Sequence, residues 1–236
     1  MKLLLKILHN DLKLILRDKS LLIMFFLPVI IILVCRVGIA ELSQYIPFLT
    51  DYYWLIVAGF TSVTASTPAF LVGFILLDER DENIHTVLKI LPLPENFILK
   101  IRTIFMMVLG FVFSFLILAF NGLVYFTFLN LLTISILFAL IPPVLTFSML
   151  ALAKNKIEAA TIYKALSVVI FLPVVAFFTP DNCEYFFGVI PFFWTYKAIQ
   201  SAEIFSLFSV SFLAGITTHT ALAFFLYRLF QKKWFS

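Results

Sequence analysis

The chain has 236 residues, 63% of them hydrophobic and 13% charged, with a formal net charge of +4 and a mean hydropathy of +1.09. Ordinary soluble domains have roughly 45–50% apolar residues, and 30 Phe would leave large apolar patches outside any soluble core of this size. These values exclude a soluble protein. They predict an integral membrane protein. The order of the residues shows no internal repeat and no soluble domain, so we expect a single transmembrane domain of the all-α class over residues 1–236.

The first 20 residues alternate Lys and Arg with Leu and Ile. They lack the continuous apolar core and the small-residue cleavage site of a secretory signal peptide. We therefore expect this segment to be retained ahead of the first membrane span.

Six segments are apolar over about 20 residues, the length that a helix needs to cross the hydrocarbon core of a bilayer. The predicted spans are residues 21–40, 53–77, 103–126, 129–153, 159–179 and 206–229. Pro142 and Pro143 interrupt the fourth span, which predicts either a hinge or a kink set by packing.

Basic residues predict the orientation, because short loops rich in Lys and Arg stay in the cytoplasm. Most basic residues precede the first span, follow the sixth span, or lie in or beside the connections between the second and third spans and between the fourth and fifth spans. The two exceptions are Arg36 and Lys197. Both termini are therefore expected in the cytoplasm. The external links would then be residues 41–52, the turn near Phe128 and residues 180–205.

The most polar stretch, residues 78–102, lies between the second and third spans and begins with the charged run DERDE at 78–82. A charge at the bilayer centre costs about 2.5–3.5 kcal/mol, so this run is expected in the cytoplasm or in a polar interface. Apolar residues with the i, i+3, i+4, i+7 spacing of one helix face follow at Ile84, Val87, Leu88 and Leu91. Two prolines end this pattern, which predicts a short amphipathic helix.

This helix has two interpretations. It could rest on the lipid surface, although such helices usually carry a polar face rich in Lys and Arg, whereas the charge here is mostly acidic. It could instead be a docking element that presents an apolar ridge and charges to a cytoplasmic partner. We favour docking, because the helix is tied directly to two spans.

A few polar residues lie within the predicted spans. Arg36, in the outer half of the first span, indicates a partner, a cavity or an ionic substrate group, unless its side chain reaches the outer interface. Thr61, Thr64 and Thr67 in the second span could line a substrate pathway. They could equally pack against neighbouring helices and satisfy the backbone near Pro68.

The stretch LLDERDENIHTVLKILPLPENFILKIR resembles the coupling-helix region of the type-2 ABC transporter permeases, in which a charged cluster leads into a Thr, a run of Leu and a Pro-containing stop. The matching residues are Glu79, Arg80, Glu82, Thr86, Leu88, Leu91 and Pro92. Ile84-His85 stands where the family often has a Gly before the Thr. NDLKLILRDKSLLIMFFLPVII resembles the family's amphipathic elbow, here residues 1–20, and the start of its first span. VIPFFWTYKAI resembles its external segment before the last span.

The resemblance implies a half-transporter: two six-span subunits, alike or different, seated on two copies of a separate ABC ATPase that binds ATP and Mg. The implied ATPase contacts are Glu79, Arg80, Glu82, Thr86, Leu88 and Leu91, with Lys154 and Glu158 in a second cytoplasmic turn as lesser contacts. That second turn could also be merely solvated. Apart from the resemblance, the aromatic residues of the external segment would suit a re-entrant or interfacial helix. On position alone, we expect Pro191 and Trp194 in an outer gate.

The chain itself is not expected to be an enzyme or to bind a cofactor, a metal or nucleic acid. It has no Gly-x-x-x-x-Gly-Lys-Ser/Thr phosphate loop, no His-Glu-x-x-His pair and no Gly-x-Ser-x-Gly elbow. Cys35 and Cys183 show no metal-ligand spacing and are interpreted as packing or incidental residues, and the sequence leaves open whether they pair.

Our leading hypothesis is the permease subunit of an ABC exporter in a prokaryotic plasma membrane, moving a hydrophobic or amphiphilic drug, peptide or lipid outward by alternating access. One alternative is an ion-gradient-driven transporter or channel, which would normally carry a carboxylate near the midplane of a span. Another is a membrane scaffold or immunity protein that uses the polar helix only for docking. The residues leave the substrate open, and also the choice between homodimer and heterodimer.

Overall fold

The computed structural model describes residues 2–82, 97–180, 183–202 and 209–235, and every regular element in these ranges is a helix. Within these ranges, six helical stretches are long and apolar enough to cross a membrane: Lys19–Tyr45, Pro47–Asp81, Phe97–Phe120, Phe128–Leu152, Lys156–Phe178 and Val210–Lys232. The predicted all-α class and the six candidate spans are confirmed. The chain is a multi-pass membrane protein.

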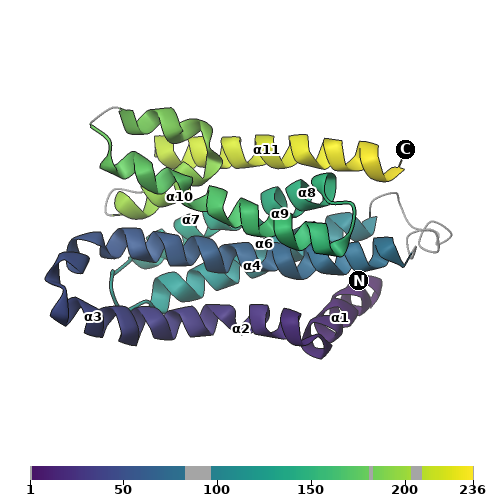
Figure 1. Cartoon of the computed structure of the whole chain (residues 1–236), viewed down its shortest axis with the longest axis horizontal. Coiled ribbons are helices and arrows are strands. Elements are labelled where there is room, and N and C mark those ends of the chain that lie inside the picture. The colour runs from purple at the N-terminus through teal and green to yellow at the C-terminus, as the bar shows by residue number, and fades with distance from the viewer. Residues whose placement is uncertain (1, 83–96, 181–182, 203–208, 236) are drawn as a thin grey trace.

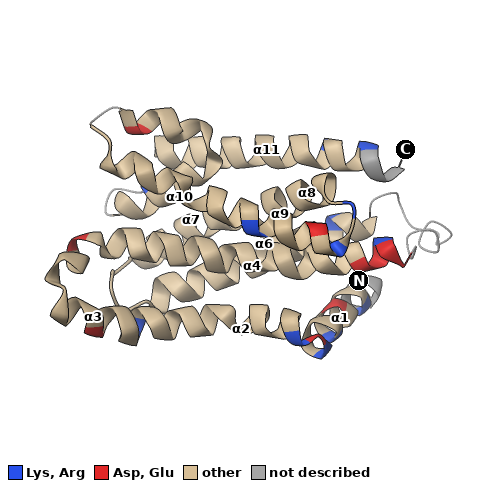
Figure 2. Cartoon of the chain, in the orientation of Figure 1, with Lys and Arg blue, Asp and Glu red and all other residues tan. Residues whose placement is uncertain are grey.

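The long helices lie side by side along the long axis of the molecule, and both termini lie at the same end (Figure 1). We call this end the terminal end. The connection between α8 (Ile141–Leu152) and α9 (Lys156–Phe171) lies there too, and charged residues are concentrated there (Figure 2). The sides of the bundle carry exposed apolar residues, including Ile23, Leu33, Ile104, Val168 and Phe224. Such a surface suits a lipid environment.

The first span is preceded by α1 (Lys2–Arg17), which occupies the place of the predicted elbow. Asp18 separates it from α2 (Lys19–Leu33) and caps α2, because its carboxylate accepts hydrogen bonds from the backbone N–H groups of Ser20 (2.7 Å) and Leu21 (3.2 Å). The span continues through a π-helical turn, η1 (Val34–Ile39), into α3 (Ala40–Tyr45). It therefore extends beyond the predicted end at residue 40.

A short 3-10 turn, η2 (Pro47–Tyr52), leads into α4 (Tyr53–Asp81), the central helix of the bundle. α4 packs against α2, α6 (Phe97–Phe120), α8, α9 and α10 (Pro191–Gln200). Its middle is rich in Gly, Ala, Ser and Thr, and small residues let helix backbones approach closely. This composition explains why α4 is buried along most of its length.

The third span is offset from its predicted range, since α6 runs from Phe97 to Phe120 rather than over 103–126. Its C-terminal end is set by Asn121, whose side-chain oxygen accepts hydrogen bonds at 2.8 Å from the N–H groups of both Leu123 and Val124. Gly122 follows with a φ of +74°, a conformation that favours glycine. An Asn-Gly turn therefore ends the helix although the residues beyond it are apolar.

The fourth span consists of two helices, α7 (Phe128–Phe138) and α8. Pro142 lies in the first turn of α8, where a missing N–H donor costs no helical hydrogen bond. The interruption predicted at the two prolines is therefore observed, just before them in the chain.

The last third of the chain adds two 3-10 segments, η3 (Leu172–Phe178) and η4 (Cys183–Val189), then α10 and α11 (Val210–Phe235). The short helix α10 packs on α11 and α4 at the end opposite the termini. A short helix therefore lies within the segment predicted to be the third external link.

Candidate functional site

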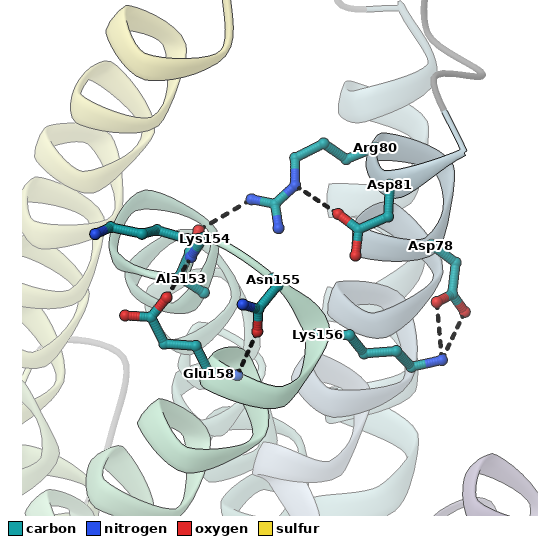
Figure 3. Close-up of polar contacts among 8 residues, drawn as sticks. All are labelled: Asp78, Arg80, Asp81, Ala153, Lys154, Asn155, Lys156 and Glu158. Atoms are coloured by element: carbon teal, nitrogen blue, oxygen red, sulfur yellow. Dashed lines mark hydrogen bonds and ion pairs between the residues drawn. The ribbon is translucent and has the colours of Figure 1, made fainter.

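The terminal end brings together the last turn of α4 and the turn between α8 and α9, the two segments predicted to contact an ATPase (Figure 3). The guanidinium of Arg80 donates a hydrogen bond through Nη1 to the carbonyl of Ala153 at 3.0 Å and pairs through Nε with Asp81 at 3.2 Å. The ammonium of Lys156 pairs with the carboxylate of Asp78 at 2.8 Å. The contacts of Arg80 with Ala153 and of Lys156 with Asp78 join residues more than 70 positions apart in the sequence.

The turn between α8 and α9 is shaped by its own side chains. Asn155 caps α9, since its side-chain oxygen accepts a hydrogen bond from the N–H of Glu158 at 2.9 Å. The carboxylate of Glu158 accepts in return from the N–H of Lys154 at 2.8 Å. This reciprocal pattern resembles a capping box, and it holds Glu158 in a structural contact while the side chain of Lys154 stays exposed.

Several side chains around this cluster remain open to a partner. Asp81, Glu82 and Lys154 are exposed, and Ile157 exposes 83% of its surface although it is apolar. The sequence reasoning did not single out Ile157. Its signal is an apolar residue in the first turn of a helix that begins just after a charged turn.

A second polar group lies deeper at the same end and joins α1, α4 and α6. The guanidinium of Arg102 donates to both carboxylate oxygens of Asp11, from Nε at 2.9 Å and Nη2 at 2.8 Å. It also donates to both carboxylate oxygens of Glu79, from Nη1 at 2.5 Å and Nη2 at 2.7 Å. We call these three residues the Arg102 triad.

The Arg102 triad is largely withdrawn from solvent. The side chains of Asp11 and Arg102 expose 2% and 4% of their surface, and that of Glu79 exposes 19%. The two bidentate pairs occupy four of the five N–H donors of the guanidinium. The sequence reasoning named Glu79 but missed Asp11 and Arg102, because it assigned Arg102 to a loop and no local pattern links two residues 91 positions apart.

The remaining predicted coupling residues are not placed by the structure. Thr86, Leu88 and Leu91 lie outside the described residues, as does Pro92. Their contact with an ATPase stays a prediction, and so does that of Glu79, Arg80, Glu82, Lys154 and Glu158.

The predicted pathway residues Thr61, Thr64 and Thr67 lie buried in α4. Each hydroxyl donates a hydrogen bond to a backbone carbonyl of its own helix. Thr61 donates to Val57 at 2.7 Å, Thr64 to Thr61 at 2.9 Å and Thr67 to Thr64 at 2.8 Å. In this conformation the three side chains are therefore part of the packed interior, and their role in a pathway stays a prediction.

Arg36 lies in the π-helical turn of the first span, and its side chain is exposed. Its stem passes close to Gly122, where an added Cβ would lie 3.1 Å from the Cγ of Arg36. The residue is thus placed beside the turn that ends α6. Its predicted place in a substrate pathway is untested.

The predicted outer-gate residues lie in α10. Pro191 occupies its first turn, and the indole N–H of Trp194 donates to the carbonyl of Gly188 at 2.9 Å. Trp194 also packs so closely on α11 that a Cβ added at Gly215 would lie 3.0 Å from the Trp194 Cβ. Pro191 and Trp194 thus lie in the same short helix, and their role in gating stays a prediction.

Metal-binding groups were also sought among the described side chains. No group of three or more His, Cys, Asp or Glu residues within these ranges could hold a metal ion. Cys35 is buried and Cys183 is exposed, and both are free thiols.

Comparison with known proteins gives a family. Two relatives from Mycobacterium tuberculosis, the fluoroquinolones export permease proteins Rv2686c (strain ATCC 25618 / H37Rv) and MT2760 (strain CDC 1551 / Oshkosh), are each 27% identical to the chain over 233 residues, which covers 95% of the chain and 92% of the relative. No solved structure matches the chain. Residues 11–227 match the family described as "Fluoroquinolones export permease protein Rv2686c-like". The chain therefore belongs to the Rv2686c-like export permease family.

Proposed function

We propose that the chain is the membrane permease subunit of an ATP-driven exporter of the ABC type, and that it moves hydrophobic or amphiphilic compounds out of the cell. The observation that carries this proposal is the family match, which spans residues 11–227 and so includes all six candidate spans nearly complete. Fluoroquinolones are the first substrates to test, because the two relatives are named for their export.

In this proposal the terminal end faces the cytoplasm of a prokaryotic cell and receives a separate ATPase. The exposed Asp81, Glu82 and Lys154 and the exposed apolar Ile157 form a mixed surface that suits a protein partner. Two permease subunits, identical or different, and two ATPase subunits would complete the transporter. ATP and Mg would be bound by the ATPase.

Alternating access would require the helices to rearrange around α4. In the structure α4 is packed on most sides. Thr61, Thr64 and Thr67 bond within their own helix, whereas Ser66 also shares a hydrogen bond with Tyr163 of α9 at 3.1 Å. A shift of α4 against α9 would break the bond between Ser66 and Tyr163, whereas contacts made by close packing of small residues can shift without breaking strong hydrogen bonds. Separation of such helices would expose a surface of small apolar residues and hydroxyl groups, which fits an amphiphilic substrate.

The export test uses intact cells and a fluorescent fluoroquinolone such as norfloxacin. Cells that express the chain together with its neighbouring genes are expected to accumulate less drug than cells carrying an empty vector. Depletion of ATP with the proton gradient kept should abolish the difference. Loss of the difference on collapse of the gradient at constant ATP would instead favour a gradient-driven transporter.

The partner test uses the tagged chain purified in mild detergent from its native host, with ATP hydrolysis measured in the eluate. Glu82→Lys is expected to reduce the amount of co-purified ATPase. Asp51→Lys is the matched control, since Asp51 is equally acidic and exposed but lies in η2 at the opposite end. Equal recovery with both variants would argue against docking at Glu82.

A variant that replaces Glu79 is unsuitable for this test. Its carboxylate is bound to Arg102, so its removal would disturb the fold as well as any partner contact. Exposed residues give a cleaner result.

A further inference from the structure

The Arg102 triad joins three elements that meet nowhere else through charged groups among the described side chains. Glu79 lies in the last turns of α4 and Arg102 near the start of α6, so these two residues stand at the two ends of segment 83–96. Asp11 belongs to α1. One guanidinium therefore binds both attachment points of the predicted coupling segment to the amphipathic helix that precedes the first span.

The geometry requires an arginine. Nε and Nη2 face one carboxylate while Nη1 and Nη2 face the other, so the two bidentate pairs use the planar fork from two sides. A lysine would supply one point charge at the same place and could not keep both pairs aligned. Because Asp11 and Arg102 are almost fully buried, water cannot replace a lost pair.

Stability alone does not account for the triad. Buried ion pairs are weak evidence for stability, because the cost of removing charges from water can exceed their attraction, and apolar residues often serve as well. The triad also carries two carboxylates for one guanidinium. Such a costly arrangement is more readily explained by its geometry, which fixes where three helices sit relative to one another.

A rigid connection runs from the triad to the first span. α1 ends at Arg17 and α2 begins at Lys19, so a single residue, Asp18, separates them, and its side chain caps α2. Ile15, one turn after Asp11, is fully buried and anchors the same face of α1. A displacement of α1 at Asp11 would therefore be passed to α2 over a short distance.

We propose that Arg102 is a positioning residue for coupling: it clamps both ends of segment 83–96 to α1, so that a push on this segment moves α1 and the first span together with α4 and α6. The inference rests on the proposed function for the source of the push. The clamp itself is a property of this chain alone and is tested separately.

The clamp is tested by hydrogen–deuterium exchange on the purified full-length chain in detergent. Arg102→Lys is expected to speed amide exchange in α1 by at least about tenfold, as local opening becomes easier, with exchange in α8 unchanged. Arg17→Lys is the matched control, because it makes the same substitution at an exposed arginine of α1, the helix whose exchange is measured. Unchanged exchange in α1 of the Arg102→Lys protein would overturn the clamp.

Coupling is tested in proteoliposomes that contain the chain with its co-purified ATPase, by measuring norfloxacin transported per ATP hydrolysed. Arg102→Lys is expected to lower this ratio by about tenfold or more while the ATPase is still recovered with the chain. A purely structural role would lower transport and hydrolysis in parallel and leave the ratio unchanged. That result would overturn the proposal.

A charge swap provides the rescue. Asp11→Arg combined with Arg102→Asp keeps one guanidinium and two carboxylates at the same junction, so it should restore slow exchange in α1 and part of the transport ratio, whereas each single change should not. Failure of the swap together with an unchanged ratio in Arg102→Lys would count against pairing. Absence of any ATP-dependent transport by the wild-type chain would sink the proposed function, and the exchange measurement would still decide on the clamp.

Discussion

Two ion pairs at the terminal end differ chiefly in their exposure to solvent. The side chains of Lys156 and Asp78 expose 38% and 44% of their surface, whereas those of Arg102 and Asp11 expose 4% and 2%. Exposed pairs are screened by water and contribute little, and a buried charge that loses its partner is strongly destabilising. The two pairs therefore offer a matched comparison within one chain.

We expect Arg102→Met to destabilise the protein by about 3–5 kcal/mol, because the buried carboxylate of Asp11 and the half-buried carboxylate of Glu79 would face each other without a cation. Lys156→Met should cost less than about 1 kcal/mol. Thermal denaturation of both purified proteins in the same detergent, followed by circular dichroism, measures the difference. Similar midpoints for the two variants would contradict the distinction drawn from burial.

Trp194 combines an aromatic ring packed on α11 with a hydrogen bond to Gly188. Trp194→Phe keeps a ring but loses the donor, which should cost about 1 kcal/mol of stability and leave partial export. Trp194→Ala should abolish export if the residue belongs to an outer gate. Tyr125→Ala is the control, since Tyr125 is an aromatic residue that is 90% exposed. Wild-type drug accumulation in cells with Trp194→Ala would remove Trp194 from the gate.

At the scale of the helices, close approach depends on a few glycines. Gly110 in α6 faces Pro142 of α8, and an added Cβ would lie 2.9 Å from the Pro142 Cγ and 3.5 Å from the backbone of Ala139. A pyrrolidine ring cannot rotate away as a flexible side chain can. The contact between α6 and α8 therefore depends on the absence of a side chain at this position.

We expect Gly110→Ala to destabilise the protein by about 1–3 kcal/mol, the usual cost of overpacking. Gly38→Ala is the matched control, because an added Cβ there would meet only Val34 of the same helical stretch, at 3.9 Å. Both changes replace a glycine inside a helical stretch with a better helix former, and the close contact with α8 exists only at Gly110. The midpoint of thermal unfolding is the measurement, and equal midpoints would show that α8 moves aside at little cost.

Hydropathy was sufficient to predict the number of spans, because a stretch of some 20 apolar residues has few stable alternatives to a membrane helix. The range that hydropathy predicted for the third span lies too far toward the C-terminus. The residues after Asn121 are apolar and were included in the span, although the Asn-Gly turn ends the helix before them. The π-helical turn at Val34–Ile39 has no signal of this kind in the sequence.

The candidate site was predictable only in part. Charged residues are too costly to place inside a membrane span, so they identified the end of α4 and the turn between α8 and α9 as segments outside the bilayer. These two segments lie together in the structure. The Arg102 triad depends on the rotation of α1 against α4 and α6, which is a property of tertiary packing. The spacing of residues within one helix does not predict how that helix is rotated against its neighbours.

For the whole molecule, the orientation in the membrane connects the site to the proposed export. The terminal end carries both termini and most of the charge, and the segment that contains η4 and α10 lies at the opposite end (Figures 1 and 2). If the terminal end is cytoplasmic, Cys183 in η4 is external, and it is an exposed free thiol. The chain thus contains its own reporter of orientation.

We expect a membrane-impermeant maleimide to label the wild-type chain in intact cells at Cys183 and to leave the buried Cys35 unlabelled. Cys183→Ala should abolish the labelling. Adding Lys154→Cys to that variant moves the exposed thiol to the terminal end, where it should react only after the cells are permeabilised. The reverse pattern would place the terminal end outside the cell, away from ATP, and neither the proposed ATPase docking nor coupling through Arg102 could then operate.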